Sequence, residues 1–191
     1  VAVIGQQMLV VAVGWELYER TGSALALGFV GLSELVAMLL FTLPAGHWAD
    51  NYDRKRIIMA ASLVIAVGSF GLALVSALKW PVAWAYACLF TIGLAQTFLR
   101  PASAAFITGL VPRKILSNAI AWNSGTFQLA SVVGPAAGGG IIALTHHAAP
   151  VFLINAAAAL TFWALLWFVR NQQVLPRPEK ISLASLATGF K

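Results

Sequence analysis

The sequence has few charged residues: Lys, Arg, Asp and Glu make up 9% of its 191 residues, while 60% are hydrophobic. So small a charged fraction excludes an ordinary soluble domain. The sequence also has one cysteine, Cys88, which excludes an intrachain disulfide. Its net charge of +6 lies in short clusters between apolar runs and not on one basic face. We therefore expect no nucleic-acid partner.

Enzyme signatures are also missing. The chain has no Gly-rich loop with Lys-Ser or Lys-Thr for nucleotide phosphates, no Gly-x-Ser-x-Gly nucleophile and no His-Glu-x-x-His zinc site. His146 and His147 are adjacent in an expected loop, but two histidines without a third ligand favour a solvated loop over a metal site. We expect no catalytic activity, no metal and no cofactor.

What the sequence does contain is long apolar runs. Most exceed the roughly 20 residues that a helix needs to cross the roughly 30 Å hydrocarbon core of a bilayer. Short links force neighbouring helices to run antiparallel. We expect an all-α membrane protein with six transmembrane helices, the first of them truncated, at about 1–18, 24–49, 57–78, 82–110, 118–144 and 151–169. This transmembrane domain covers residues 1–170, and residues 171–191 form the start of a cytoplasmic central linker.

The cations predict the orientation of these helices. Nine fall on one side of the membrane and two on the other, while Arg100 lies within the fourth run. The side with the excess of Lys and Arg is predicted to be cytoplasmic. The nine are Arg54, Lys55, Arg56, Arg113, Lys114, Arg170, Arg177, Lys180 and Lys191, and the two are Arg20 and Lys79.

The segment between the second and third runs resembles the signature loop at this place in the major facilitator superfamily. That pattern reads Gly, three residues, Asp, a basic residue, any residue, Gly and then several basic residues. Gly46, Asp50 and the cations Arg54, Lys55 and Arg56 match it, while Asn51 replaces a base and Asp53 replaces a glycine. The resemblance implies that this loop governs conformational switching more than it contacts substrate.

Gly125 and the run from Gly134 to Gly139 in the fifth segment resemble the antiporter motif of drug-exporting members of that superfamily. Pro135 removes one backbone donor, and Gly134, Gly138 and Gly139 let a neighbouring helix approach closely. A bend or close crossing here would control which side of the protein opens. The alternative is ordinary packing of small residues in a membrane.

A faint internal repeat relates the second and fifth segments. Ser23 and Ser117 precede them as candidate N-caps, and both segments carry Pro and Gly near their far ends. Two three-helix repeats of inverted topology build one half of a major facilitator transporter. The repeat therefore favours that architecture.

Glu34 is the candidate proton-coupling residue. Counting about 1.5 Å per residue from Ser23 places it roughly 16 Å deep, near the middle of the membrane. An ionised carboxylate is costly there, so we expect Glu34 to be protonated for part of the cycle or to face water or a cation. The alternative is a permanently neutral side chain that hydrogen-bonds to a neighbouring helix.

Arg100 is the candidate member of a charge network. The same count places it about 28 Å along the fourth helix, which separates it from the depth of Glu34 by roughly 12 Å. We therefore expect Arg100 to meet the acidic residues of the Asp50 loop, or lipid phosphate, rather than Glu34. Drug exporters of the superfamily often carry an Arg here, but Pro101-Ala102 replaces the Gln-Gly that usually follows.

Polar residues at helical spacing predict a cavity. Gln6, Gln96 and Gln128, from the first, fourth and fifth segments, are candidates to line it. Hydrogen bonding from helix to helix is the alternative interpretation.

Together these features resemble the N-terminal six-helix half of a major facilitator transporter, in the bacterial branch of enterobactin, macrolide and drug exporters. Trp15-Glu16-Leu17-Tyr18, Thr21-Gly22-Ser23 and Leu27-Gly28 contribute to this resemblance. It implies proton-coupled efflux of a small amphipathic substrate by alternating access, in the bacterial inner membrane. It also implies a C-terminal six-helix half, beyond residue 191, as a partner. A membrane subunit energised by a separate ATPase, and a non-transporting scaffold or sensor, are the alternatives.

Overall fold

The computed structural model describes residues 2–169, so the predicted linker and the cations from Arg170 onward lie outside the described residues. Within this range the chain forms α-helices and no strand, which confirms the all-α class. The helices are α1 (Ala2–Thr21), α2 (Ala24–Asn51), α3 (Arg54–Ala77), α4 (Val82–Leu110), α5 (Leu116–Thr145) and α6 (Ala149–Phe168), and a short 3-10 helix η1 (Arg113–Ile115) precedes α5.

Five of these helices, α2 to α6, are long and apolar enough to cross a membrane. Helix α1 is not among them, and it carries Glu16, Glu19 and Arg20 in its last turns. The described residues therefore have the helices of a multi-pass membrane protein. The predicted sixth membrane-spanning helix would have to be α1, so that part of the fold stays a prediction.

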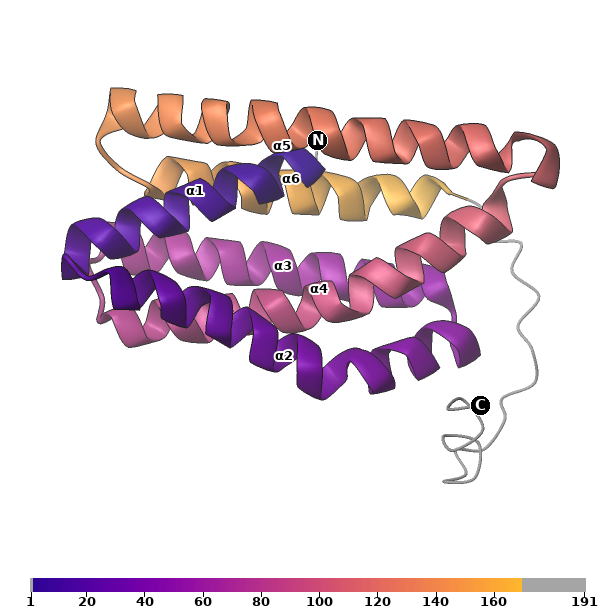
Figure 1. Ribbon diagram of the computed structural model, residues 1–191, viewed down its shortest axis with the longest axis horizontal. Coiled ribbons are helices and arrows are strands. Elements are labelled where there is room, and N and C mark those ends of the chain that lie inside the picture. The colour runs from indigo at the N-terminus through magenta and orange to yellow at the C-terminus, as the bar shows by residue number, and fades with distance from the viewer. Residues whose placement is uncertain (1, 170–191) are drawn as a thin grey trace.

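The helices form a bundle whose connections alternate between its two ends (Figure 1). The α1–α2, α3–α4 and α5–α6 connections lie at one end, and the α2–α3 and α4–α5 connections lie at the other. Helix α3 packs between α4 and α6, while α2 packs mainly on α4 and α5 mainly on α1. Helices α2 and α5 therefore form the edges of the bundle, and apolar side chains such as Leu43 and Leu144 are exposed on them.

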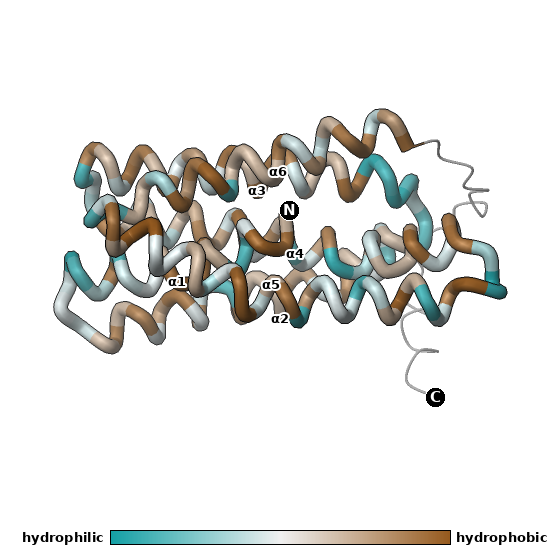
Figure 2. Tube along the Cα trace, turned by 90° about the horizontal axis from the view of Figure 1, so that it is seen from above, coloured by the Kyte–Doolittle hydropathy of each residue, from teal (hydrophilic) through white to brown (hydrophobic). Residues whose placement is uncertain are grey.

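Figure 2 shows hydrophobic residues along the length of the helices and hydrophilic ones mainly at the turns. The core lies between the inner helices, where Leu9, Leu89 and Phe152 are fully buried. Asn155 of α6 donates a 2.8 Å hydrogen bond to the Ser69 hydroxyl of α3, and both side chains are buried. This bond satisfies polar groups that have no access to water.

The connection between α2 and α3 is shorter than expected. Helix α2 continues through Asn51 and α3 begins at Arg54, so only Tyr52 and Asp53 separate the two helices. Asp53 is the N-cap of α3, and its carboxylate accepts a 2.9 Å hydrogen bond from the backbone N–H of Lys55. This cap starts the helix early enough to place the three basic residues in its first turn.

One of the two predicted N-caps is wrong. Ser23 occupies the N-cap position of α2, although its side chain makes no capping hydrogen bond. Ser117, in contrast, lies inside the first turn of α5, whose N-cap is Ile115. The reason is that η1 leads directly into α5 and leaves no extended residue at position 117.

Candidate functional site

A pocket of about 450 Å³ lies between α2 and α4. Its lining follows one stripe on each helix, at the spacing of three and four residues that places side chains on one helical face. The α2 stripe consists of Gly31, Glu34, Leu35, Met38, Thr42 and Gly46. The α4 stripe consists of Gly93, Gln96, Thr97, Arg100 and Pro101. The pocket therefore brings together Glu34, the predicted proton-coupling residue, Arg100, which was expected to lie away from it, and Gln96, one of the predicted cavity residues.

Glu34 lies half-buried in the α2–α4 pocket. Gly93 of α4 faces it: a Cβ atom at Gly93 would lie 3.3 Å from the Cα of Glu34 and 3.5 Å from its Cγ. A larger residue would push the two helices apart, so Gly93 holds α4 against the carboxylate-bearing turn. Gly93 was not among the residues predicted from the sequence, although a glycine three residues before Gln96, on the same helical face, was a usable signal.

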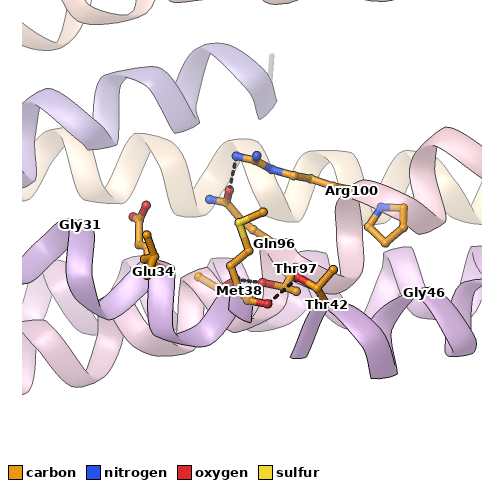
Figure 3. Close-up of a pocket in the computed structure, with 11 residues that line it drawn as sticks. Gly31, Glu34, Met38, Thr42, Gly46, Gln96, Thr97 and Arg100 are labelled. Atoms are coloured by element: carbon orange, nitrogen blue, oxygen red, sulfur yellow. Dashed lines mark hydrogen bonds between the residues drawn. The ribbon is translucent and has the colours of Figure 1, made fainter. Parts of the chain in front are cut away.

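Arg100 reaches back along α4 toward Glu34. Its Nη2 donates a 3.4 Å hydrogen bond to Oε1 of Gln96, one turn earlier, and Figure 3 shows Gln96 between Arg100 and Glu34. Long side chains on a helix point toward its N-terminus, and this direction carries the guanidinium away from the depth of its own Cα. No ion pair joins Glu34 to Arg100 in residues 2–169, but the two side chains share one pocket. The described hydrogen bond of Arg100 goes to Gln96 and not to the acidic residues of the Asp50 loop that we expected it to meet, because the side chain extends toward the N-terminus of α4 and away from that loop.

Both helices that line the pocket contain a proline, Pro44 in α2 and Pro101 in α4. Proline lacks the N–H that would bond to the carbonyl four residues earlier, and its ring bends the helix. Nearby, the hydroxyls of Thr42 and Thr97 bond to backbone carbonyls one turn back, which also favours bending. The pocket thus lies between two locally weakened helices, and the bend in α2 is visible in Figure 1.

The basic residues that follow Asp50 bond to backbone carbonyls of three other segments of the bundle. Arg54 donates from Nε to the carbonyl of Ala49 in α2 at 3.0 Å, and from Nη1 to that of Ala105 in α4 at 3.1 Å. Lys55 donates to the carbonyl of Val169, just after α6, at 2.8 Å. Ala49 and Val169 lie at the carbonyl ends of α2 and α6, where unpaired acceptors and partial negative charge are stabilised by cations. Ala105 lies inside α4, before its last turn. These bonds tie the start of α3 to α2, α4 and α6.

The remaining members of the predicted switch loop lie in different surroundings. Gly46 lines the α2–α4 pocket, so the loop and the pocket share a residue. Asp50 is exposed, and Arg56 is exposed with its Nε 3.6 Å from the Asp53 carboxylate. The role of this loop in switching stays a prediction.

A second cluster joins helices at the opposite end of the bundle. Arg20 of α1 pairs with Glu16 at 2.6 Å and donates to the carbonyls of Val75 and Trp80, each at 2.9 Å. Glu16 also accepts a 2.9 Å hydrogen bond from Ser76. This cluster caps the end of α3 from α1, as the α3 cations cap other helices at the far end. From the sequence, Arg20 was predicted only to be one of the two cations on the outer side of the membrane.

Two glycines of the predicted antiporter motif hold α5 against α1. A Cβ at Gly138 would lie 3.1 Å from the carbonyl oxygen of Met8 and 3.2 Å from its Cα. A Cβ at Gly134 would overlap the Cβ of Gln7. The spacing of four residues between the glycines places both on the face that meets α1. They therefore provide the close helix approach that the motif predicts.

The other residues of that motif do not take part in this contact. A Cβ at Gly125 or Gly139 would meet no atom of the described chain within 4 Å, and Pro135 lies inside α5. Gly125 is exposed on α5. A role for these residues in opening the protein stays a prediction.

The remaining predicted residues lie outside the α2–α4 pocket. Gln6 is half-buried on α1 and Gln128 is exposed on α5, and neither is part of the lining that contains Gln96. His146 and His147 lie near the end of α5, and residues 2–169 contain no group of three His, Cys, Asp or Glu side chains that could hold a metal ion.

The described residues form a multi-pass helical bundle with charged and polar side chains in a pocket between two of its helices, which is an arrangement found among membrane transporters. The sequence pattern of the Major Facilitator Superfamily matches residues 1–189, and the chain belongs to this family of transporters. The family predicted from the Asp50 loop is thereby confirmed.

Relatives of the chain include three bacterial proteins, two of them named for export or efflux. The enterobactin exporter EntS of Shigella flexneri is 29% identical over 197 aligned residues, which cover 100% of this chain and 47% of that protein. The macrolide efflux protein A of Streptococcus pyogenes is 29% identical over 71% of this chain and 34% of its own length. Multidrug resistance protein 1 of Bacillus subtilis (strain 168) is 25% identical over 88% of this chain and 42% of its own length. The chain thus spans less than half the length of each of these relatives, and they confirm the resemblance to exporters.

Proposed function

We propose that the chain is the N-terminal half of a proton-coupled exporter that moves a small amphipathic molecule across the bacterial cytoplasmic membrane. The observation that carries this proposal is the α2–α4 pocket, in which Glu34 lies near Arg100 and Gln96 in a helical pair of a transporter family. Glu34 is the group in that pocket whose charge can change, because a carboxylate can gain and lose a proton whereas a guanidinium keeps its charge.

A second six-helix half is the proposed partner. The chain covers less than half of the exporters that it matches, and the edge helices α2 and α5 expose apolar side chains that need a cover of protein or lipid. In this proposal α1 is the sixth crossing, and α1–α3 and α4–α6 are two repeats of inverted topology.

Alternating access is the proposed mechanism. The bends at Pro44 and Pro101 let α2 and α4 change shape around the pocket, and the bonds from Arg54 and Lys55 hold one arrangement of the helix ends. Breaking these hydrogen bonds would let the helix ends move into the second arrangement, in which the pocket opens to the other side of the membrane. The Asp50 loop then controls switching, while the pocket binds substrate and proton.

Export by the full-length protein tests the proposal. Reconstituted into vesicles with an imposed proton gradient, it should move an amphipathic fluorescent dye, and a protonophore should stop the movement by dissipating the gradient. Residues 1–191 alone should give no flux above empty vesicles, because they form one wall of the pathway. Flux that requires ATP and survives the protonophore would instead identify a subunit energised by an ATPase.

The proposed orientation has a separate test. In a full-length variant lacking Cys88, single cysteines at Asn51 or Ser117 should resist an impermeant thiol reagent in intact cells, because these sites lie at the end with the excess of cations. Cysteines at Ser23 or His146, at the other end of the bundle, should react. The reverse labelling pattern would place the α2–α3 connection outside the cell.

A further inference from the structure

Gly93 brings the backbone of α4 directly against the turn of α2 that carries Glu34. A Cβ atom at Gly93 would lie 3.3 Å from the Cα of Glu34, 3.5 Å from its Cγ and 3.7 Å from its Cβ. The contact is thus made with the backbone and the stem of Glu34, and not with a flexible side-chain end. A side chain at position 93 would fit only if one of the two turns moved.

Helices α2 and α4 are also fixed to each other on both sides of this contact. Toward the start of both helices, the Tyr86 hydroxyl of α4 donates a 2.9 Å hydrogen bond to the carbonyl of Ala26 in α2. Toward their ends, Phe98 of α4 packs on Trp48 of α2 with 5.5 Å between the ring centroids. An atom added at Gly93 would therefore displace the neighbouring turn locally, because the helices are held together above and below it.

The Glu34 carboxylate itself has no bonded partner in residues 2–169, where it makes neither a hydrogen bond nor an ion pair. The charged lining group on α4 is Arg100, whose described bond goes to Gln96. The charged residues of α1 lie in its last turns and the cations of α3 in its first turn, and none of them lines the pocket. Water stabilises the ionised form of a carboxyl group, and exclusion of water favours the neutral form. Besides the charge of Arg100, the packing of α4 against Glu34 therefore decides how readily this group takes up a proton.

We propose that Gly93 is a positioning residue for the carboxyl group of Glu34. Because Gly93 has no side chain, α4 lies close enough to exclude water from one side of Glu34, and this closeness sets the pH at which the protein takes up its proton. Gly93 acts through Glu34 and not on the substrate. The inference rests on the proposed function, in which Glu34 carries the proton, and it deepens that function by naming what sets its pH range.

Replacing Gly93 with alanine in the full-length protein tests the inference. A contact of 3.3 Å requires the neighbouring turn to move by only a few tenths of an ångström, so the variant should fold. The new methyl group would lie beside the stem of Glu34 and push it from α4 without covering the carboxyl oxygens, so that water reaches them more easily. The pH profile of proton-driven dye export should therefore move toward acidic pH by about half a unit or more, a fraction of the effect of full burial.

Chemical labelling provides a measurement that does not depend on transport. Dicyclohexylcarbodiimide reacts with carboxyl groups in their protonated form, and mass spectrometry of the purified full-length protein reports the labelled fraction of Glu34. Across a pH series, half-maximal labelling of Glu34 should require a more acidic pH in Gly93→Ala than in the wild type. Gly93→Val, with a larger side chain at the same contact, should move this pH further in the same direction.

Gly28→Ala is the matched control. Gly28 lies on α2, six residues before Glu34, and a Cβ atom there would meet no atom of the described chain within 4 Å. It is also not part of the pocket lining. The substitution adds the same methyl group to the helix that carries Glu34, and both the export profile and the labelling of Glu34 should match those of the wild type.

Three results would overturn the inference: an unchanged labelling profile in Gly93→Ala, a shift of that profile toward alkaline pH, or an equal shift in Gly28→Ala. Wild-type export that is proton-driven alongside any of these results would leave the proposed function in place. Wild-type export without proton dependence would instead reject the proposed function, whether or not the labelling of Glu34 responds to Gly93.

Discussion

Replacing Glu34 with glutamine in the full-length protein should reduce export driven by a proton gradient to the level of empty vesicles. Glutamine preserves the shape of the side chain and most of its hydrogen bonding, but it cannot carry a proton on and off. Glu34 lies half-buried in the α2–α4 pocket, in contact with the turn of α4 that contains Gly93. A change in the charge of Glu34 would therefore change its electrostatic interaction with the α4 residues that line the pocket.

Dye efflux from vesicles, measured for both forms across a pH series, checks this expectation. Substrate binding and exchange without a gradient should persist in Glu34→Gln, because the pocket keeps its shape. Glu19→Gln is the control, since it removes a carboxylate near the end of α1, away from the pocket, and should export normally. Wild-type export with unchanged pH dependence in Glu34→Gln would mean that Glu34 only packs helices.

Replacing Gly134 with alanine should destabilise the protein strongly. The new methyl group would overlap the Cβ of Gln7 and lie 3.1 Å from the carbonyl oxygen of Ile4, so α1 would have to move away from α5. Inserting atoms into such a contact costs about 1–3 kcal/mol of folding free energy. We expect a lower thermal unfolding temperature for the purified full-length protein in detergent.

Gly139 provides a matched control for this substitution. It lies on the same helix, five residues further on, but a Cβ there meets no atom of the described chain within 4 Å. Gly139→Ala should therefore unfold at the wild-type temperature or slightly above it, since alanine favours helix more than glycine does. Equal unfolding temperatures for the two variants would show that the α1–α5 contact is looser than the structure places it.

The sequence alone determined the helices and the family. The thickness of a bilayer fixes the length of an apolar run, and polar residues are needed where the chain leaves it, so each helix could be located from composition. The Asp50 loop carried the resemblance to the major facilitator superfamily because a motif is a local pattern. Glu34, Gln96 and Arg100 were also singled out one by one, since each is a polar residue within an apolar run.

Only the tertiary structure decided which of these residues meet. A count along each helix gives the depth of a Cα atom, but it contains neither the pairing of α2 with α4 nor the direction in which Arg100 extends. In the same way, the motif around Pro135 did not distinguish Gly134 and Gly138, which contact α1, from Gly125 and Gly139, where a Cβ atom would have open space around it. Helix formation depends on neighbours along the chain, whereas a pocket or a close crossing depends on residues that only packing brings together.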